Sequence, residues 1–232
     1  SDDADDVEDI TSICGGLNIN IGTLNKNTIP SMFLAGKKAN ELGHIVLLDP
    51  VGAGASRLRT DTANRLMREV RFDAVRGNIS EIKTLCTGSG TTKGVDADAV
   101  DAVTEANLDD GVALVKAFAR QTGCIIAVTG AIDLVSDGAR CWCIRNGRAE
   151  MSRITGTGCQ LSALTTAFLV ANPEHKLEAA AAAVCMMGLA GEIGWANMQP
   201  GDGNSTYRNR IIDAIFNMTG DALEEGAKYE LR

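Results

Sequence analysis

The chain has 232 residues, a formal net charge of −8 and a hydrophobic content of 45%. This length suits one α/β domain spanning residues 1–232, and the hydrophobic content is high enough for a packed core. Proteins that bind duplex nucleic acid need a positively charged surface, which the acidic balance disfavours. Aromatic residues make up only 4% of the chain, so a surface that stacks unpaired bases is disfavoured as well.

The cysteines and the apolar segments indicate where the protein works. Seven cysteines occur without disulfide-framework spacing or a C-x-x-C pair, which favours reduced thiols in the cytosol. The most apolar segment, Leu177 to Ala190, contains Glu178 and is too short to span a bilayer. We therefore expect a cytoplasmic protein without a membrane span. The chain starts at Ser1 without a methionine, and we expect an N-terminal segment to be missing.

Hydrophobic periodicity and turn residues predict alternating strands and helices. The predicted strands, in chain order, are Leu17–Ile21, Ile45–Leu48, Phe72–Val75, Ile125–Val128 and a hairpin of Asp133–Val135 with Arg140–Ile144. The predicted helices run from Thr28 to before Gly43, from Thr60 or Asp61 to Val70, from Ser80, and over Asp109–Gln121, Thr157–Val170, Glu174–Ala196 and Thr206–Phe216. Residues Gly88 to Asp96 are expected to form a loop rich in glycine.

This alternation predicts right-handed crossovers, a mainly parallel central sheet and a three-layer α/β/α fold. In such sheets, ligands bind beyond the carboxyl ends of the strands. Polar side chains stand at or just after the predicted strand ends: Asp49, Arg76, Asn78, Glu81 and Thr129. The sequence therefore favours a ligand-binding enzyme with its site at this edge of the sheet.

The segment Thr155 to Cys159 (TGTGC) directly precedes an apolar helix. Gly156 and Gly158 let backbone N–H groups converge there, and the helix start adds the positive end of its dipole. Such a pocket can hold a phosphoryl group during transfer, although an ordinary glycine turn with a helix cap is the alternative. Cys159 lies in the first helical turn, where the dipole lowers a thiol pKa. It is a candidate base for an attacking hydroxyl, or else a buried inert cysteine.

Asn78 and Glu81 place an amide and a carboxylate on one side of the first turn of another helix. Oxygen donors of this kind suit Mg²⁺, which usually keeps waters and binds one or two carboxylates beside substrate phosphates. The alternative is structural, with Asn78 or Ser80 capping the helix and Glu81 complementing its dipole.

Arg76 offers a planar guanidinium that suits a phosphate, and Asp49 can serve a metal ion or the reacting centre. Gly52 and Gly54 permit a close approach of the backbone to a ligand. Position 57 holds Arg57 where a dinucleotide fingerprint would have glycine, and no Walker A motif or G-x-S-x-G elbow occurs.

Seven motifs occur in order along the chain: Leu48 to Ala55 (LDPVGAGA), Arg59-Thr60, Arg76 to Glu81, Ala127 to Gly130, Asp133 to Gly138, Thr155 to Cys159, and Gly188 to Glu192. Together they resemble the hydroxyethylthiazole kinases, which belong to the ribokinase-like superfamily. The resemblance extends from about residue 7 to about residue 218.

This resemblance implies Mg²⁺-dependent transfer of the ATP γ-phosphate to the alcohol of 4-methyl-5-(2-hydroxyethyl)thiazole, a step of thiamine salvage and biosynthesis. It implies the following roles: Arg76, Thr129 and Asn78 at ATP; Gly156, Gly52 and Cys159 at the thiazole; Thr157 and Gly158 amides in the anion hole; and Glu81 with Asp49 at the metal, through water. Cys159 stands where most ribokinase-like enzymes carry an aspartate base, and thiazole kinases are similar to this chain in having cysteine there.

The resemblance also implies a homotrimer that shares substrate pockets between subunits, and an N-terminal segment that lines the pocket and precedes this chain. Three other interpretations stay open. The first is a ribokinase-like kinase for another alcohol, such as hydroxymethylpyrimidine. The second is an ADP/ATP-dependent NAD(P)H-hydrate dehydratase, and the third is a nucleotide sensor without catalytic activity. Cys159 in place of aspartate disfavours the first two.

Overall fold

The computed structural model describes residues 2–88 and 102–232. Its centre is a seven-stranded sheet whose strand order equals the chain order, from β1 to β7. The strands are β1 Gly16–Asn20, β2 Ile45–Asp49, β3 Ala74–Asn78, β4 Ile125–Thr129, β5 Asp133–Ser136, β6 Cys141–Ile144 and β7 Tyr229–Leu231. Strands β1 to β4 pair in parallel, and β4 to β7 continue the sheet with antiparallel pairs.

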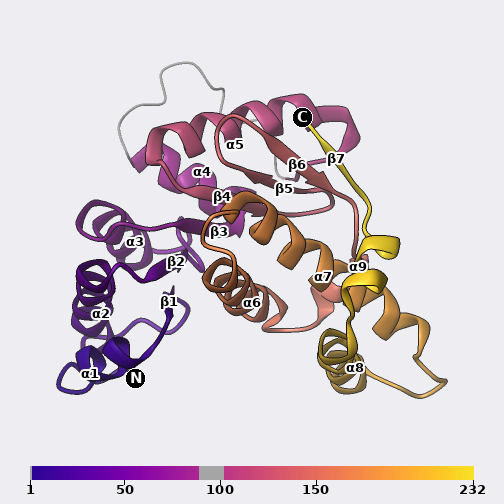
Figure 1. The fold of residues 1–232 in the computed structure, drawn as a ribbon, viewed down its shortest axis with the longest axis horizontal. Helices are drawn as coiled ribbons and strands as arrows, with labels where there is room; N and C mark the ends of the chain where they lie inside the picture. The colour runs from indigo at the N-terminus through magenta and orange to yellow at the C-terminus, as the bar shows by residue number, and fades with distance from the viewer. Residues whose placement is uncertain (1, 89–101) are drawn as a thin grey trace.

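Helices cover both faces of this sheet, which confirms the three-layer prediction (Figure 1). One face carries α2 Thr28–Leu42, α3 Arg57–Glu69, α4 Ile79–Gly88 and α5 Leu108–Thr122. The other face carries α6 Thr157–Ala171 and α7 Lys176–Ala196, against which α8 Asn204–Asn217 and α9 Gly220–Gly226 pack. The sequential strand order explains the division, because right-handed crossovers place the helices between parallel strands on one face.

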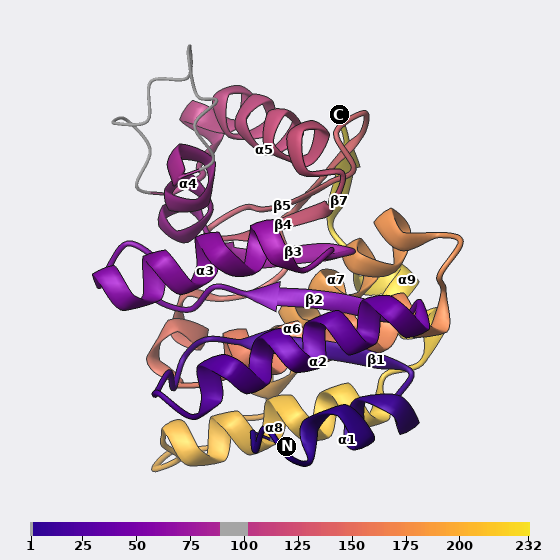
Figure 2. The same ribbon diagram turned by 90° about the vertical axis from the view of Figure 1, so that its left-hand side faces the viewer.

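The remaining short elements lie outside these layers. Helix α1 Val7–Ile13 packs against α2, as both views show (Figure 2). Two 3₁₀ turns, η1 Glu105–Asn107 and η2 Ala149–Arg153, precede α5 and α6.

The strand β2 shows how the sequence determines this architecture. All five of its residues are buried, as a continuous apolar run predicts for a strand covered on both faces. Successive side chains point to opposite faces, so Leu48 packs with α2 to α5 and Leu47 packs with α6 to α8. The alternation leaves Asp49, the last residue of β2, on the same face as Leu47 and therefore below α6.

The observed bounds of some helices and strands differ from the predicted ones. Helix α3 begins at Arg57 rather than at Thr60, because the Ser56 hydroxyl caps it by accepting the Arg59 N–H at 3.3 Å. Strand β3 starts at Ala74 and continues through Asn78, so Arg76 lies inside the strand. Apart from Gly88, which ends α4, the predicted glycine-rich loop lies outside the described residues.

Helix α7 begins at Lys176, two residues after the predicted start at Glu174, and ends at Ala196 as predicted. It spans 21 residues, and within the described part of the chain it is the helix that could cross a membrane by length and composition. In this fold 67% of its most apolar window is buried, because it packs against α6, α8 and the sheet.

Candidate active site

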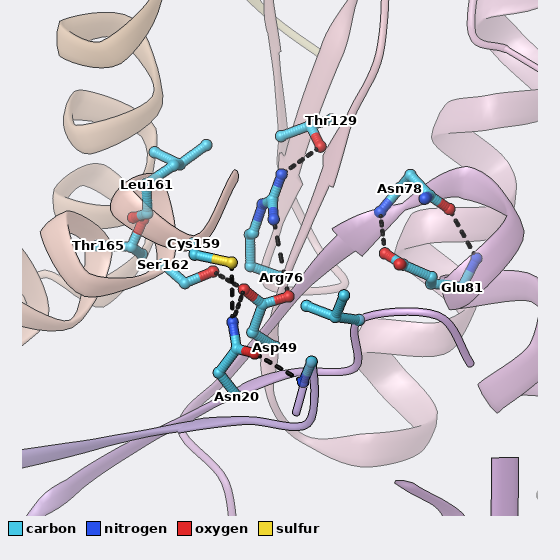
Figure 3. A network of polar contacts seen from close by, with 12 residues as sticks. Asn20, Asp49, Arg76, Asn78, Glu81, Thr129, Cys159, Leu161, Ser162 and Thr165 are labelled. Carbon is cyan, nitrogen blue, oxygen red and sulfur yellow. Dashed lines mark hydrogen bonds and ion pairs between the residues drawn. The ribbon is translucent and has the colours of Figure 1, made fainter. Parts of the chain in front are cut away.

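The carboxyl ends of the parallel strands and the start of α6 meet at the buried carboxylate of Asp49 (Figure 3). Asp49 Oδ2 accepts hydrogen bonds from Asn20 Nδ2 and from Ser162 Oγ, each at 2.8 Å. Asp49 Oδ1 lies 3.7 Å from Arg76 Nη1 and accepts no hydrogen bond from the described residues. Burial raises the pKa of Asp49, and the Arg76 charge counteracts part of this rise.

Arg76 links this carboxylate to the next strand and to α6. Its Nη2 donates to Thr129 Oγ1 at 2.8 Å, while its buried Nε has no partner within residues 2–88 and 102–232. A Cβ on Gly158 would lie 2.8 Å from Arg76 Nη1, so glycine at this position lets the helix start approach the guanidinium. A cation directly below a helix N-terminus is an arrangement that attracts phosphate groups.

The first turn of α6 leaves its backbone donors available. Gly156 stands at the N-cap position with φ of +96°, and no side chain caps the helix. The N–H groups of Thr157, Gly158 and Cys159 have no acceptor within the helix, because they precede the first complete turn. These donors and Arg76 Nη1 therefore approach the same region from two elements.

Cys159 is exposed at this helix start and contacts the polar network below it. Its Sγ lies 3.1 Å from Asn20 Nδ2, the same nitrogen that donates to Asp49. The other end of that amide is also occupied, because Asn20 Oδ1 accepts the Gly22 N–H at 2.8 Å. The thiol and the buried carboxylate thus share one amide as donor.

Glu81 belongs to a separate hydrogen-bonded cluster at the start of α4. Its Oε1 accepts the Gly52 N–H and its Oε2 accepts the Asn78 N–H, both at 2.8 Å. Asn78 Oδ1 in turn accepts the Glu81 N–H at 2.8 Å. Asn78 therefore caps α4, and two backbone amides hold the Glu81 carboxylate. This is the capping arrangement that the sequence left open for this segment.

A guanidinium clamp holds the loops that follow β1 and β2. Arg59 Nη1 donates to Ile21 O at 2.9 Å and to Val51 O at 2.8 Å, and its Nη2 donates to Gly22 O at 2.8 Å. In the sequence, Arg59 stood out only as part of the Arg59-Thr60 motif. Its contacts show a structural task, which is to hold two loops of the site at a fixed separation.

A cavity of about 570 Å³ opens beside this network, between the β4–β5 turn, the start of α6 and α7. Its walls include Arg76, Thr129, Asp133, Thr157 and Gly158. Asp133 is half-buried and its Oδ1 accepts the Gly130 N–H at 2.8 Å. Burial raises the pKa of Asp133 to about 7, although the Gly130 N–H and the Arg76 charge act in the opposite direction.

Asp49 and Glu81 are the candidate carboxylate ligands for Mg²⁺. Among the described residues no three His, Cys, Asp or Glu side chains gather as a metal cluster. Asp49 Oδ1 is a buried oxygen without a hydrogen bond, and Glu81 keeps lone pairs beyond the two that accept amides. Two such carboxylates fit an ion that also takes water and substrate oxygens.

The structure places the predicted residues in two groups. Asp49, Arg76, Thr129, Gly158 and Cys159 gather around one network, whereas Gly52, Asn78 and Glu81 form the cluster at α4. Asn20 and Ser162 were missed, and Asp133 was marked only as the first residue of a motif. Asn20 had a signal, because it is the polar residue that ends β1 as Asp49 ends β2.

Comparison with solved structures defines the class of protein. The hydroxyethylthiazole kinase protein from Pyrococcus horikoshii OT3 superposes with a TM-score of 0.86 and 30% identity, over 100% of this chain and 83% of that one. The pyridoxal kinase from Staphylococcus aureus in complex with ADP superposes with a TM-score of 0.60 and 20% identity, over 97% and 76%. The fold is therefore that of the ribokinase-like small-molecule kinases.

Sequence comparison then gives the family. The model of the hydroxyethylthiazole kinase family matches residues 1–221. A hydroxyethylthiazole kinase from Clostridium acetobutylicum is 55% identical over 230 residues, which are 99% of this chain and 84% of that protein. One from Ruminiclostridium cellulolyticum is 44% identical over 228 residues, with 98% and 81% covered. The chain belongs to the hydroxyethylthiazole kinase family.

Asp133 gives the first testable prediction. Its pKa in the folded state is raised to about 7, so between about pH 4 and that value the folded chain binds more protons than the unfolded chain. Its contribution to stability is therefore lost as the pH rises through this window. Asp133→Asn keeps an acceptor for the Gly130 N–H but does not titrate, so the variant should gain stability relative to wild type as the pH rises.

Urea unfolding of both proteins at about pH 5.5 and about pH 8 measures this difference. The gain should not exceed roughly 1.4 kcal/mol for each unit of pKa difference. A difference in unfolding free energy that stays the same at both pH values would contradict the prediction.

Proposed function

We propose that this chain transfers the γ-phosphoryl group of ATP to the hydroxyl of 4-methyl-5-(2-hydroxyethyl)thiazole. Its family carries the name of this activity, and ATP use follows from the kinase class. The observation that supports the site is the Arg76 guanidinium below the start of α6, with exposed Cys159 beside it.

Phosphate binding falls to Arg76 and the first turn of α6. The N–H groups of Thr157 and Gly158 form the anion hole, and the guanidinium adds a full positive charge. Thr129 holds the guanidinium through its hydroxyl, and with Asn78 it completes the ATP side. Gly156 and Gly52 offer backbone surface to the thiazole, since neither carries a side chain.

Proton transfer falls to Cys159. Phosphoryl transfer through a loose transition state places little demand on a base, so the Cys159 sulfur suffices to accept the hydroxyl proton. Exposure of Cys159 makes it accessible to the substrate alcohol. In the class of ribokinase-like enzymes that uses aspartate here, a carboxylate would perform the same task.

We propose that Asp49 and Glu81 hold Mg²⁺, Asp49 through its unpartnered Oδ1 and Glu81 through bridging water. The ion would neutralise charge on the phosphate oxygens of ATP when bound. Arg76 keeps the Asp49 carboxylate from being an isolated buried charge, and the two amides at Glu81 fix the direction of its remaining lone pairs.

The function is tested by ADP release from the full chain with ATP and Mg²⁺, offered the thiazole alcohol or hydroxymethylpyrimidine. Turnover is expected with the thiazole alcohol, because the family match covers the parts of the chain that form the site. A parallel assay for recovery of NADH from its hydrate tests the dehydratase interpretation. Turnover with the pyrimidine alone, or recovery of NADH, would overturn the proposal.

The role of Arg76 is tested by ATP titration calorimetry. Arg76→Ala removes a charged hydrogen bond worth roughly 1.5–3 kcal/mol, so ATP affinity should fall by about tenfold to a hundredfold. Arg76→Lys should lose less, since it keeps the charge that compensates Asp49. Arg57→Ala, at an arginine whose side chain is 95% exposed, is the matched control. Equal ATP affinity in wild type and Arg76→Ala would exclude the role.

We also propose a cytoplasmic homotrimer. Free thiols support the cytoplasm, since none of the seven cysteines forms a disulfide. Large apolar side chains are exposed on α1 and α8, with Ile13 at 82% and Phe216 at 87%, and subunit contacts would cover such surface. Light scattering should give about three times the chain mass of 24.4 kDa, and a monomer mass would refute the trimer.

A further inference from the structure

The amide of Asn20 lies at the junction of β1, β2 and α6. Its Nδ2 is 2.8 Å from Asp49 Oδ2 and 3.1 Å from Cys159 Sγ (Figure 3). A side-chain amide nitrogen carries two hydrogens, so one is available for each of these acceptors. Within residues 2–88 and 102–232, the hydrogen bond to the Cys159 sulfur comes from Asn20.

The orientation of this amide is fixed by the backbone. Asn20 Oδ1 accepts the Gly22 N–H at 2.8 Å, so the nitrogen has to face Asp49 and Cys159. Rotating the side-chain amide by half a turn would lose the hydrogen bond from Gly22. It would also place Asn20 Oδ1 against Asp49 Oδ2, and two acceptors repel each other. The Cys159 sulfur therefore accepts a hydrogen bond from the Asn20 amide.

The charges around this amide balance one another. The Asp49 carboxylate opposes a second negative charge nearby, but Ser162 Oγ donates to it and Arg76 Nη1 lies 3.7 Å away. Asn20 stands between the carboxylate and the sulfur and donates to both. A carboxylate at position 20 would instead place another hydrogen-bond acceptor between the Asp49 carboxylate and the Cys159 sulfur.

We propose that Asn20 is a positioning residue for phosphoryl transfer, because it holds the Cys159 sulfur as an acceptor for the proton of the substrate alcohol. This rests on the function proposed above. The alcohol oxygen forms its bond to the γ-phosphorus while the bond from that phosphorus to the bridging oxygen of ADP breaks. The bridging oxygen leaves with the electron pair, and the alcohol proton moves to the Cys159 sulfur.

The test measures the reactivity of Cys159 without turnover. Cys14 and Cys159 are the exposed cysteines, and the other five are buried. Trypsin releases Cys14 in residues 1–26 and Cys159 in residues 154–176, each as the single cysteine of its peptide. Mass spectrometry of the full chain treated with iodoacetamide at one fixed pH therefore gives two separate alkylation rates.

Asn20→Ala should slow alkylation of Cys159 about threefold and leave Cys14 unchanged. The Asn20 N–H stabilises negative charge on the attacking sulfur, so loss of this hydrogen bond should slow the reaction with iodoacetamide. Asn20→Asp keeps the acceptor for Gly22 but turns a carboxylate towards the sulfur, so it should be slower still. The kcat should fall in the same order, with the KM for ATP unchanged.

Ser162→Ala is the matched control, because it removes the other hydroxyl or amide donor to Asp49 Oδ2 without touching the sulfur. Its Cys159 alkylation rate should equal that of wild type. Labelling of the five buried cysteines reports unfolding, and if Asn20→Ala unfolds, the near-isosteric Asn20→Asp decides.

Alkylation of Cys159 at the wild-type rate or faster in a folded Asn20 variant would overturn the proposal, as would equal slowing by Ser162→Ala. Failure of the proposed function has a different signature. Wild type would then release no ADP with the thiazole alcohol, while the alkylation rates would still report the hydrogen bond.

Discussion

The buried carboxylate of Asp49 is the constraint on which this site depends. A carboxylate without contact to water is costly unless charges and donors surround it. Asn20, Ser162 and Arg76 supply them, and each comes from a different element. Because these partners must converge on one group, the end of β2 determines where β1, β3 and α6 can lie. The need to stabilise one carboxylate thereby brings the guanidinium and the thiol to the same place.

Much of this arrangement could be predicted because it follows from the geometry of parallel strands. The carboxyl ends of β2, β3 and β4 share one edge, so Asp49, Arg76 and Thr129, which stand at or near those ends, come together. The glycines at the start of α6 could also be predicted. Gly156 has a positive φ, and a Cβ on Gly158 would meet the Arg76 guanidinium. Local sequence carries both signals.

Other features depend on packing that no local pattern encodes. Ser162 lies inside α6, and its contact with Asp49 depends on how that helix crosses the sheet. The sequence could not separate a capping role of Asn78 from a ligand role, because both require the same residue at the same helix start. The start of α3 was placed too late for a related reason, since Ser56 caps it and the polar residues that follow also resemble caps.

Gly22 connects the guanidinium clamp to the thiol. Its carbonyl accepts from Arg59, and its N–H donates to the Asn20 amide that contacts Cys159. A Cβ at this glycine would lie 2.8 Å from Asn20 Oδ1, which leaves little space for any side chain. Chemical reactivity at the start of α6 is therefore coupled mechanically to a peptide group in the loop after β1. A displacement of that loop would therefore also move the amide that contacts the sulfur.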